Sequence, residues 1–411
     1  MKNPKIRFKG YTDDWEWHKL EDMLLLLKDG THGTHANVDS GIYLLSAKNI
    51  KNGCININES DRQISLEEYE KIHTNFQLMQ GDVLMTIVGT IGDAAILENP
   101  ENITFQRSVA FLRTNENLDN FFLVHTISTK NFQKELDSRK SISAQPGIYL
   151  GEVAQIPIMI PKEVKEQKKI GAYFSRLDNL ITLHQQKCEE TKILKRYMLQ
   201  KMFPQNGTNI PEIRFNEFTD AWEQCKFGDC NDLITGYPFE SEKFTNQGIK
   251  LVRGMNVKRG YLDFADEICM WWDSSEGLEK FLLENNDILI QMDGALIGKS
   301  YAKIKKSQLP ALLVQRVTRA RTKRKMADSN FMYQTIQRDF LHYITMNKTE
   351  TAVPHLSLKD IREFKINVPS LEEQQRIGGC FNAIDHLINL HQRKCDELQS
   401  IKKFMLQNMF V

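Results

Sequence analysis

Short apolar runs separated by Gly, Asn and Asp fill residues 20–160 and predict β-strands. The runs IYLLSA, DVLMTIVG and SVAFLR are examples, and each is bounded by residues that favour turns. The stretches SLEEYEKIH and FFLVHTISTKNFQKEL have the composition and spacing of short helices instead. This mixture predicts an α+β globule.

Two longer segments have apolar positions that step by four and three, as in a heptad seam. The first follows Pro161 and continues to Phe203, where Pro204 and the QNGTN stretch end it. Its seam positions are Ile170, Phe174, Leu177, Ile181, His184, Cys188, Thr191, Lys195, Met198 and Met202. The second seam consists of Ile377, Phe381, Ile384, Ile388, His391, Cys395, Leu398, Lys402, Met405 and Met409. About 40 helical residues at ~1.5 Å each predict a rod of about 60 Å in each case.

The sequence contains an internal repeat, in which segments of the first half recur 207 residues later. PKIRFKGYTDDWEWHKLED from Pro4 recurs as PEIRFNEFTDAWEQCKFGD from Pro211. At the same offset, Gly41–Gly53 matches Gly248–Gly260, and Glu166–Cys188 matches Glu373–Cys395. Between these anchors the match weakens and the offset drifts by a residue or two. A repeated segment does one structural job twice, so the sequence predicts two similar frames with different side chains between the anchors.

The repeat divides the chain into a globule, a rod, a second globule and a second rod. The predicted boundaries are residues 1–160 and 209–368 for the globules, and 161–208 and 369–411 for the long helices with the linker. Antiparallel packing of the two rods, with the globules separated by them in a pseudo-two-fold arrangement, would bury both seams. An alternative is that each rod lies on its own globule as an ordinary amphipathic helix.

Composition narrows the protein class. The 411 residues include 54 Lys and Arg against 53 Asp and Glu, so the net charge is +1 and no global field attracts nucleic acid or an anionic membrane. The seven cysteines are odd in number and contain no C-x-x-C pair, and the start of the chain is too polar for a signal peptide. No apolar run approaches the ~20 residues of a membrane span. We therefore expect a reduced, cytoplasmic protein that makes no membrane contact.

Motifs for catalysis are missing from the sequence. It contains no N-P-P-Y or D-P-P-Y, no G-x-G-x-x-G, no phosphate-binding G-x-x-x-x-G-K-[ST] and no H-E-x-x-H. This pattern favours a recognition protein without catalytic or cofactor-binding residues of its own over a self-sufficient nuclease or methyltransferase. An interaction scaffold, with rods that mediate assembly and globules that bind protein, remains the alternative.

The repeated segments resemble a known family, the DNA specificity subunits of type I restriction-modification systems. The resemblance is carried by the P-x-I-R-F-x-x-x-T-D-x-W-E opening of each half, by the EQ(K/Q)(K/R)IG lead into each rod, and by the LHQ(Q/R)KC…MLQ-x-MF ending. DGTHGTH followed by GIYLLSAKNI also looks like one type of that family's target recognition domain.

The resemblance implies that each globule reads one half of a split, asymmetric site in double-stranded DNA, while the rods set the spacing. It also implies two methyltransferase (modification) subunits as partners, which would methylate adenine at N6 with S-adenosylmethionine. Restriction/translocase subunits that use ATP and Mg²⁺ would complete the complex. Because few phosphate contacts are available in a nearly neutral chain, we expect weak DNA binding by the isolated chain.

Polar loop residues are the candidates for DNA contact, because base edges are read by polar side chains and phosphates by cations and hydroxyls. In the first globule they are Thr31, His32, Thr34, His35, Lys48, Asn49, Thr86, Thr90, Gln106, Arg107, Arg139, Lys140, Ser143 and Gln145. In the second they are Thr235, Tyr237, Arg253, Asn256, Gln291, Asp293, Gln315, Arg316, Lys348 and His355. The run from Arg316 to Lys325 has six basic residues in ten and is the densest positive stretch, suited either to phosphates or to a solvated strand edge.

Four residues of the two heptad seams have side chains that could bind a metal ion instead of packing as core. His184 with Cys188, and His391 with Cys395, are two pairs at i, i+4, and a tetrahedral zinc site could be drawn from them. Seam positions are usually core, and a free Cys behaves as a small buried hydrophobe, so we expect no metal.

Overall fold

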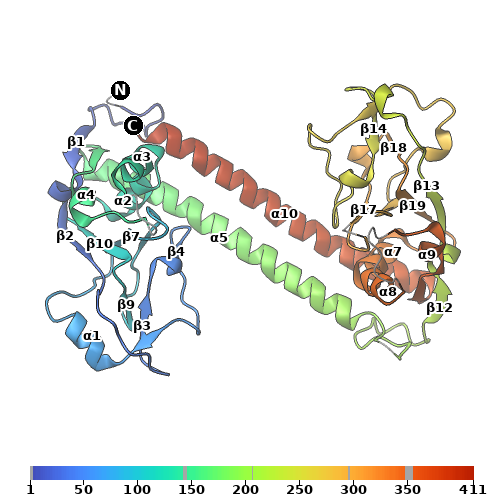
Figure 1. Cartoon of the computed structure of the whole chain (residues 1–411), viewed down its shortest axis with the longest axis horizontal. Helices are drawn as coiled ribbons and strands as arrows, with labels where there is room; N and C mark the ends of the chain where they lie inside the picture. The colour runs from blue at the N-terminus through green and yellow to red at the C-terminus, as the bar shows by residue number, and fades with distance from the viewer. Residues whose placement is uncertain (1–2, 142–145, 206, 295–296, 348–354) are drawn as a thin grey trace. The chain divides into compact units, whose positions relative to one another are not determined.

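The computed structural model describes residues 3–141, 146–205, 207–294, 297–347 and 355–411. They form two compact units, one of residues 1–186 with 392–411 and the other of residues 187–391 (Figure 1). Each unit therefore combines one globule with parts of both long helices. No helix within the described ranges is long and apolar enough to cross a membrane.

The first unit is built on a four-stranded antiparallel sheet with the order β2-β10-β7-β8. A three-stranded sheet, β6-β3-β9, and two small pairs, β1-β11 and β4-β5, complete its strands. Their bounds are β1 Glu16–Lys19, β2 Leu24–Asp29, β3 Ile42–Leu45, β4 Ile50–Lys51, β5 Cys54–Ile55, β6 Gln63–Ile64, β7 Val83–Thr86, β8 Ala94–Ile96, β9 Ile103–Phe105, β10 Val109–Thr114 and β11 Pro157–Ile160.

Three of the four short helices of the first unit, α1, α2 and α3, start at side-chain caps that the sequence supplies. Their bounds are α1 Leu66–Ile72, α2 Asn120–Ile127, α3 Lys130–Arg139 and α4 Leu150–Ala154. Asp119 accepts a hydrogen bond from the backbone N–H of Phe122 at the start of α2, and Thr129 caps α3 in the same way. The single helical stretch predicted from FFLVHTISTKNFQKEL is therefore two helices, because Thr129 starts a second one. The mixed α and β character predicted for the globule is confirmed.

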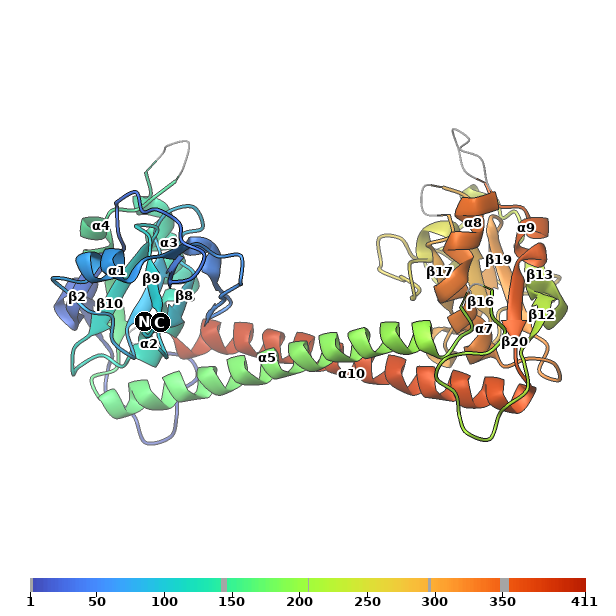
Figure 2. The ribbon, with the colours of Figure 1, turned by 90° about the horizontal axis from the view of Figure 1, so that it is seen from below.

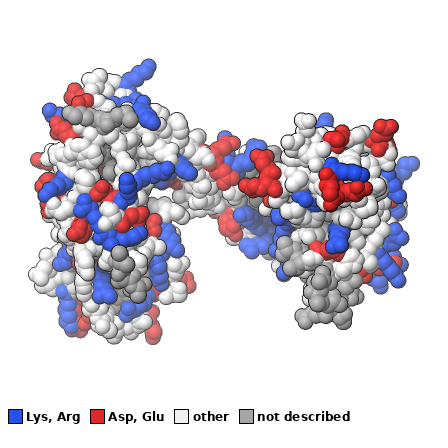
Figure 3. Space-filling view, turned by 45° about the horizontal axis from the view of Figure 1, so that its top comes forward, with Lys and Arg blue, Asp and Glu red and all other residues white. Residues whose placement is uncertain are grey.

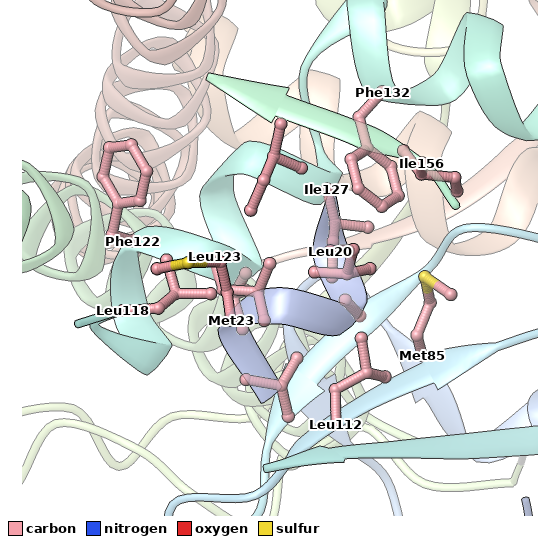
Figure 4. Packing of buried hydrophobic residues seen from close by; sticks show 14 of the residues in the cluster. Leu20, Met23, Met85, Leu112, Leu118, Phe122, Leu123, Ile127, Phe132 and Ile156 are labelled. Carbon is pink, nitrogen blue, oxygen red and sulfur yellow. The ribbon is translucent and has the colours of Figure 1, made fainter. Parts of the chain in front are cut away.

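The core of the first unit lies between the four-stranded sheet and α2 and α3 (Figure 4). Met85 and Leu112 come from strands β7 and β10, and Phe122, Leu123 and Ile127 come from α2; all five are buried. Burial of apolar surface of this kind is the main stabilising contribution to the fold.

The second unit has the same strand orders as the first. Its sheets are β13-β19-β16-β17, β15-β14-β18 and β12-β20. The bounds are β12 Glu223–Lys226, β13 Asn231–Thr235, β14 Ile249–Val252, β15 Trp271–Trp272, β16 Ile288–Gln291, β17 Tyr301–Lys303, β18 Ala311–Leu313, β19 Val317–Thr322 and β20 Lys365–Val368. Its short helices are α6 Phe227–Cys230, α7 Ser329–Thr335, α8 Leu341–Asn347 and α9 Leu358–Glu363, and a π-helical turn at Ile336–Phe340 joins α7 to α8. Figure 2 shows β19, β16 and β17 side by side beside α7 and α8.

The two long helices are α5, Val164–Lys201, and α10, Leu371–Met409. Their lengths of 38 and 39 residues agree with the prediction of about 40. Within the first unit, Ile170, Phe174 and Leu177 of α5 are buried in the globule's core, and Met405 of α10 packs against that same core. The start of α5 thus packs on its own globule and on the end of α10 in one shared core.

Ion pairs between the long helices are repeated in the two units. Asp178 of α5 accepts a hydrogen bond from Lys402 of α10 at 2.5 Å in the first unit. Lys195 of α5 donates to Asp385 of α10 at 2.7 Å in the second. Each of these residues is related to its counterpart by the offset of 207. In each unit the start of one helix therefore meets the end of the other, so the helices are antiparallel there.

The ends of the helices close onto aromatic clusters that also recur. Phe410 packs on Trp15 and Phe122 with ring centroids 6.3 and 5.2 Å apart. In the second unit, Phe203 packs on Trp222 and Phe331 at 5.6 and 5.3 Å. A Phe just after the long helix, a Trp and a second Phe thus attach the end of α10 to the first globule and the end of α5 to the second.

His125 provides a difference between the two otherwise similar helix junctions. Its Nδ1 lies 3.9 Å from the carboxylate of Asp178, whereas Gln334 occupies the corresponding place in the second unit and donates to Asp385 at 3.2 Å. Burial, reinforced by the positive charge of Lys402, lowers the pKa of His125 from 6.5 to about 3. The imidazole is therefore neutral in the folded protein at physiological pH.

This lowered pKa predicts a loss of stability in acid. Below pH 6.5 the unfolded chain binds a proton at His125 that the folded protein does not, so the free energy of unfolding falls as pH falls toward about 3. Between pH 7 and pH 5 the contribution of His125 amounts to about 2 kcal/mol. We expect His125→Gln, which copies the second unit, to lose that much less stability over this interval, measured by urea unfolding at both pH values. Equal losses in the two proteins would contradict the assignment.

Candidate nucleic-acid interface

Loops from four strands of the first unit meet at the turn between β9 and β10. The backbone N–H of Thr31 donates to Phe105 O at 2.9 Å, and that of Arg107 donates back to Thr31 O at 3.0 Å. Ile87, just after β7, donates to Ser108 O at 2.9 Å, and Ala47 donates to Ser108 Oγ at 3.0 Å. The segments after β2, β3, β7 and β9 therefore converge on residues 105–108.

Side chains around this turn form a small polar network. His35 Nε2 lies 2.7 Å from Thr31 Oγ1, and its Nδ1 lies 2.8 Å from a carboxylate oxygen of Glu68. His32 pairs with Asp29 at 2.7 Å. The candidates Thr34, Thr90 and Arg107 are exposed, and Gln106 is half-buried. Of the predicted residues, the structure thus brings Thr31, His35, Gln106 and Arg107 into one neighbourhood.

Cations at the edge of this region are paired with carboxylates. Lys48 contacts Asp61 at 2.7 Å, and the carboxylate of Asp61 is buried. Arg139, at the end of α3, contacts Glu135 at 3.0 Å and Glu152 at 3.4 Å. Lys140 pairs with Asp137 at 2.8 Å. The candidates Ser143 and Gln145 lie outside the described residues.

The second unit repeats the same backbone hydrogen bonds with other side chains. Tyr237 N–H donates to Leu313 O at 3.0 Å, Gln315 N–H donates to Tyr237 O at 2.9 Å, and Met292 N–H donates to Arg316 O at 2.9 Å. These bonds make Gln315 the counterpart of Arg107, and Arg316 the counterpart of Ser108. The residue types Gln-Arg recur as Gln106–Arg107 and Gln315–Arg316, but the two pairs are out of register by one residue. The local offset is 208 here, because the strand pairing and not residue identity sets the register.

A cavity of about 340 Å³ opens at this turn of the second unit. Its lining includes the predicted Arg253, Gln291, Asp293, Gln315 and Arg316. It also includes three residues that the sequence reasoning missed, namely Phe239, Ser241 and Phe244. The aromatic-rich stretch after Tyr237 was the available signal for them, because aromatic and hydroxyl side chains on a loop are typical of binding surfaces.

Asp293 is the hub of the polar contacts at this cavity. Its carboxylate forms an ion pair with Arg316, whose Nη1 lies 3.2 Å from Oδ2, and it also contacts His355 Nδ1. Its backbone oxygen accepts from Gln291 Nε2 at 2.8 Å. Arg253 is held differently, since its guanidinium donates to Ile268 O at 2.6 Å and burial lowers its pKa. Tyr237 and Thr235 are exposed nearby, and Lys348 lies outside the described residues.

Three of the predicted contact residues are used inside the fold instead. Asn49 is buried and bonds to Ser46, Asn56 and Asp61, and its counterpart Asn256 is buried and bonds to Arg253 and Asp263. Thr86 is fully buried, and its hydroxyl bonds to the backbone of Asp93. The prediction of DNA contact was wrong for these side chains, because local backbone groups already satisfy their hydrogen-bonding capacity.

The basic run from Arg316 to Lys325 is not a continuous positive surface. Arg319 is buried and pairs with Asp232, while Arg321 contacts Asp287 at 2.8 Å and Glu284 at 2.5 Å. The run lies largely on β19, so alternate side chains point to opposite faces. On the face drawn in Figure 3, Lys and Arg are interspersed with Asp and Glu. The structure thus favours local recognition over a broad electrostatic field.

No group of three or more His, Cys, Asp or Glu side chains suited to a metal ion was found in the part of the chain that the structure describes. The arrangement suits binding through polar side chains held by paired backbone strands.

Comparison with known proteins identifies the family. The model of the type I restriction modification DNA specificity domain matches residues 12–192 and again residues 219–400. The chain belongs to the family of type I restriction-modification DNA specificity subunits. The two matched segments contain the two loop turns described above, one in each segment.

Individual relatives agree with this assignment. The chain is 30% identical over 217 residues to the type I restriction enzyme EcoAI specificity subunit of Escherichia coli, a match that spans 52% of this chain and only 36% of that protein. It is 23% identical to the MjaVIII specificity subunit of Methanocaldococcus jannaschii, with 95% of this chain and 91% of that protein covered. The solved type I S subunit from M. genitalium has the same fold, with a TM-score of 0.71 at 15% identity over 100% of this chain and 99% of that chain.

The buried Asn256 offers a test of its structural role. Asn256→Ala leaves the backbone N–H of Arg253 and the carbonyl of Asp263 without their partner, which costs about 1–3 kcal/mol. We expect a lower free energy of unfolding for this variant, measured by urea denaturation, with the DNA sequence preference of the assembled complex unchanged. An altered preference at wild-type stability would instead assign Asn256 to recognition. Asn49→Ala is the matched variant in the first unit.

Proposed function

We propose that this chain reads a bipartite, asymmetric site in double-stranded DNA, one half-site per globule, and directs partner subunits to it. The support is the repeated backbone frame at the two loop turns, where equivalent hydrogen bonds hold different side chains. Thr31, Arg107 and Ser108 in the first unit correspond to Tyr237, Gln315 and Arg316 in the second. Different side chains in the same frame present different donor and acceptor patterns, and so suit different half-sites.

The long helices act, in this proposal, as a spacer between the two half-sites. Each has 38 or 39 residues, which corresponds to about 57 Å at ~1.5 Å per residue. The number of base pairs between the half-sites then follows from helix length together with any bending of the DNA.

Partner docking on the helices is supported by a repeated apolar surface. Leu194 and Tyr197 on α5 are 49% and 48% exposed, and their counterparts Ile401 and Phe404 on α10 are 45% and 55% exposed. Residues three apart lie on one face of a helix, so each pair forms a small apolar patch. Two equivalent patches suit two copies of one partner, and we assign them to two methyltransferase (modification) subunits.

Catalysis belongs to the partners in this proposal. The methyltransferase subunits would use S-adenosylmethionine to methylate adenine, and restriction/translocase subunits would use ATP and Mg²⁺. The present chain contributes recognition and needs no cofactor. Its net charge of +1 and its many paired cations support weak DNA binding until partners add phosphate contacts.

The proposal predicts methylation that depends on this chain. We expect co-expression with its methyltransferase subunits to place N6-methyladenine at a single split motif in host DNA, mapped by methylation-sensitive sequencing with and without the chain. Methylation that is unchanged by the chain, or that ignores sequence, would contradict the recognition role and favour a protein-binding scaffold.

Docking on the helices is tested by placing charge in one patch. Leu194→Asp with Tyr197→Asp is expected to reduce the co-purified methyltransferase from two copies to one per chain, because a carboxylate at an apolar interface is costly to desolvate. Mass measurement of the purified complex gives the copy number. Ile401→Asp with Phe404→Asp should have the same effect through the other patch. Lys192→Asp with Arg196→Asp, on the opposite face of α5, is the control and should retain two copies; loss there would refute the assignment.

A further inference from the structure

Arg316 has an unusual backbone conformation at the mouth of the second unit's cavity. Its φ is +66°, in the left-handed region that side chains other than Gly and Asn seldom adopt. The other non-glycine residues with positive φ in the described ranges are all asparagines, Asn52, Asn102 and Asn286. The Arg316 side chain is 72% exposed, so packing of that side chain into a core does not account for the strain. Strained positions of this kind cluster at binding sites, where they aim a side chain.

The guanidinium of Arg316 is held from one side by a carboxylate. Nη1 lies 3.2 Å from Oδ2 of Asp293, whose side chain is only 20% exposed. Asp293 is in turn fixed by its contact with His355 and by the bond from Gln291 Nε2 to its backbone oxygen. With Nη1 held by Asp293, the rest of the planar donor fork is directed to solvent. An arginine held in this way loses little side-chain entropy on binding.

The first unit has the same backbone arrangement without this group. Hydrogen bonds and β-bridges place Ser108 where the second unit has Arg316, Val88 where it has Asp293, and Gly147 where it has His355. Ser108 instead accepts a bond from the backbone of Ala47, at the inner side of the turn. Arg316, Asp293 and His355 are therefore specific to the second unit. They are not part of the backbone frame that both units share.

Two DNA groups suit an exposed arginine, a phosphate and the edge of a guanine. A phosphate is disfavoured here, because the carboxylate of Asp293 lies beside the guanidinium and would repel it. A guanine fits, because its O6 and N7 accept two parallel hydrogen bonds from an oriented guanidinium, while a carboxylate beside it accepts from the amino group of cytosine. Of the polar lining residues, Gln291 and Gln315 are neutral, and the guanidinium of Arg253 is engaged by the backbone oxygen of Ile268 at 2.6 Å.

We propose that Arg316, positioned by Asp293, reads the guanine of a G·C base pair in the half-site of the second globule. This inference rests on the proposed function, since it concerns one position of the DNA motif. Arg316 contacts the base, and Asp293 is a positioning residue that fixes the direction of the guanidinium and disfavours other bases.

The test is a comparison of methylation motifs in the full complex with its methyltransferase subunits. With Arg316→Ala, we expect discrimination at one G·C position in one half of the motif to fall by about 10- to 100-fold, with the other half unchanged. Arg316→Lys retains the charge without the planar fork and should relax the same position by less. Asp293→Asn should also relax that position, because the amide holds the guanidinium less firmly.

Arg324→Ala is the matched control, because it removes an exposed arginine of the same unit away from the cavity. It should leave the motif unchanged. Uniform loss of methylation in both Arg316 variants, with no change in motif, would assign Arg316 to a phosphate and overturn the inference. An unrelaxed motif in Arg316→Lys and Asp293→Asn, or a half-site without a G·C pair, would also overturn it. Failure of the proposed function looks different, since the wild-type chain would then direct methylation to no motif.

Discussion

Each long helix is attached to its globule through one buried carboxylate. Glu166, near the start of α5, accepts two hydrogen bonds from Arg7 at 2.7 and 2.8 Å, and its side chain is 1% exposed. Glu373, near the start of α10, accepts the same two bonds from Arg214. A buried carboxylate without its arginine costs several kcal/mol, on the order of 3–5, so the opening segment of each half and the helix that follows it are joined tightly. The direction of the helix relative to the sheets depends on this contact.

Close backbone approach reinforces the same junction. A Cβ on Gly171 would lie 2.9 Å from the backbone nitrogen of Phe122, and one on Gly378 would lie 2.8 Å from that of Phe331. The residues directly after the two buried glutamates add a further link. The side chains of Gln167 and Gln374 accept hydrogen bonds from the backbone N–H groups of Asp119 and Asp328, which cap α2 and α7. The retained I-R-F and E-Q elements of the sequence repeat are therefore the parts that position a helix on a sheet. Their repetition reflects one structural requirement that is met twice.

The residues that differ between the halves lie where the frame leaves room for them. At the loop turns the backbone is paired in both units, so a side chain can change there without loss of the strand register. The contrast of Ser108 with Arg316, and of Val88 with Asp293, places an arginine–carboxylate pair where the first unit has two neutral side chains. His125 and Gln334 show that the frame itself also tolerates a polar exchange, provided that the side chain still faces the Asp–Lys pair between the helices. A backbone frame that is repeated in both units, with different side chains at the loop turns, is physically suited to a protein that reads two unlike half-sites.

The repeat, the α+β character of each half and the two long helices are predictable from the sequence, because they follow from residue spacing over many positions. Which polar residues are free to bind depends on contacts that form only in the folded chain. Asn49, Asn256 and Thr86 are polar candidates by sequence, yet backbone groups up to seven residues away along the chain hydrogen-bond to their side chains. Likewise Arg319 and Arg321 read as part of a positive run until strand pairing brings Asp232 and Asp287 beside them. The partner of a polar side chain is set by three-dimensional proximity, which periodicity and composition do not encode.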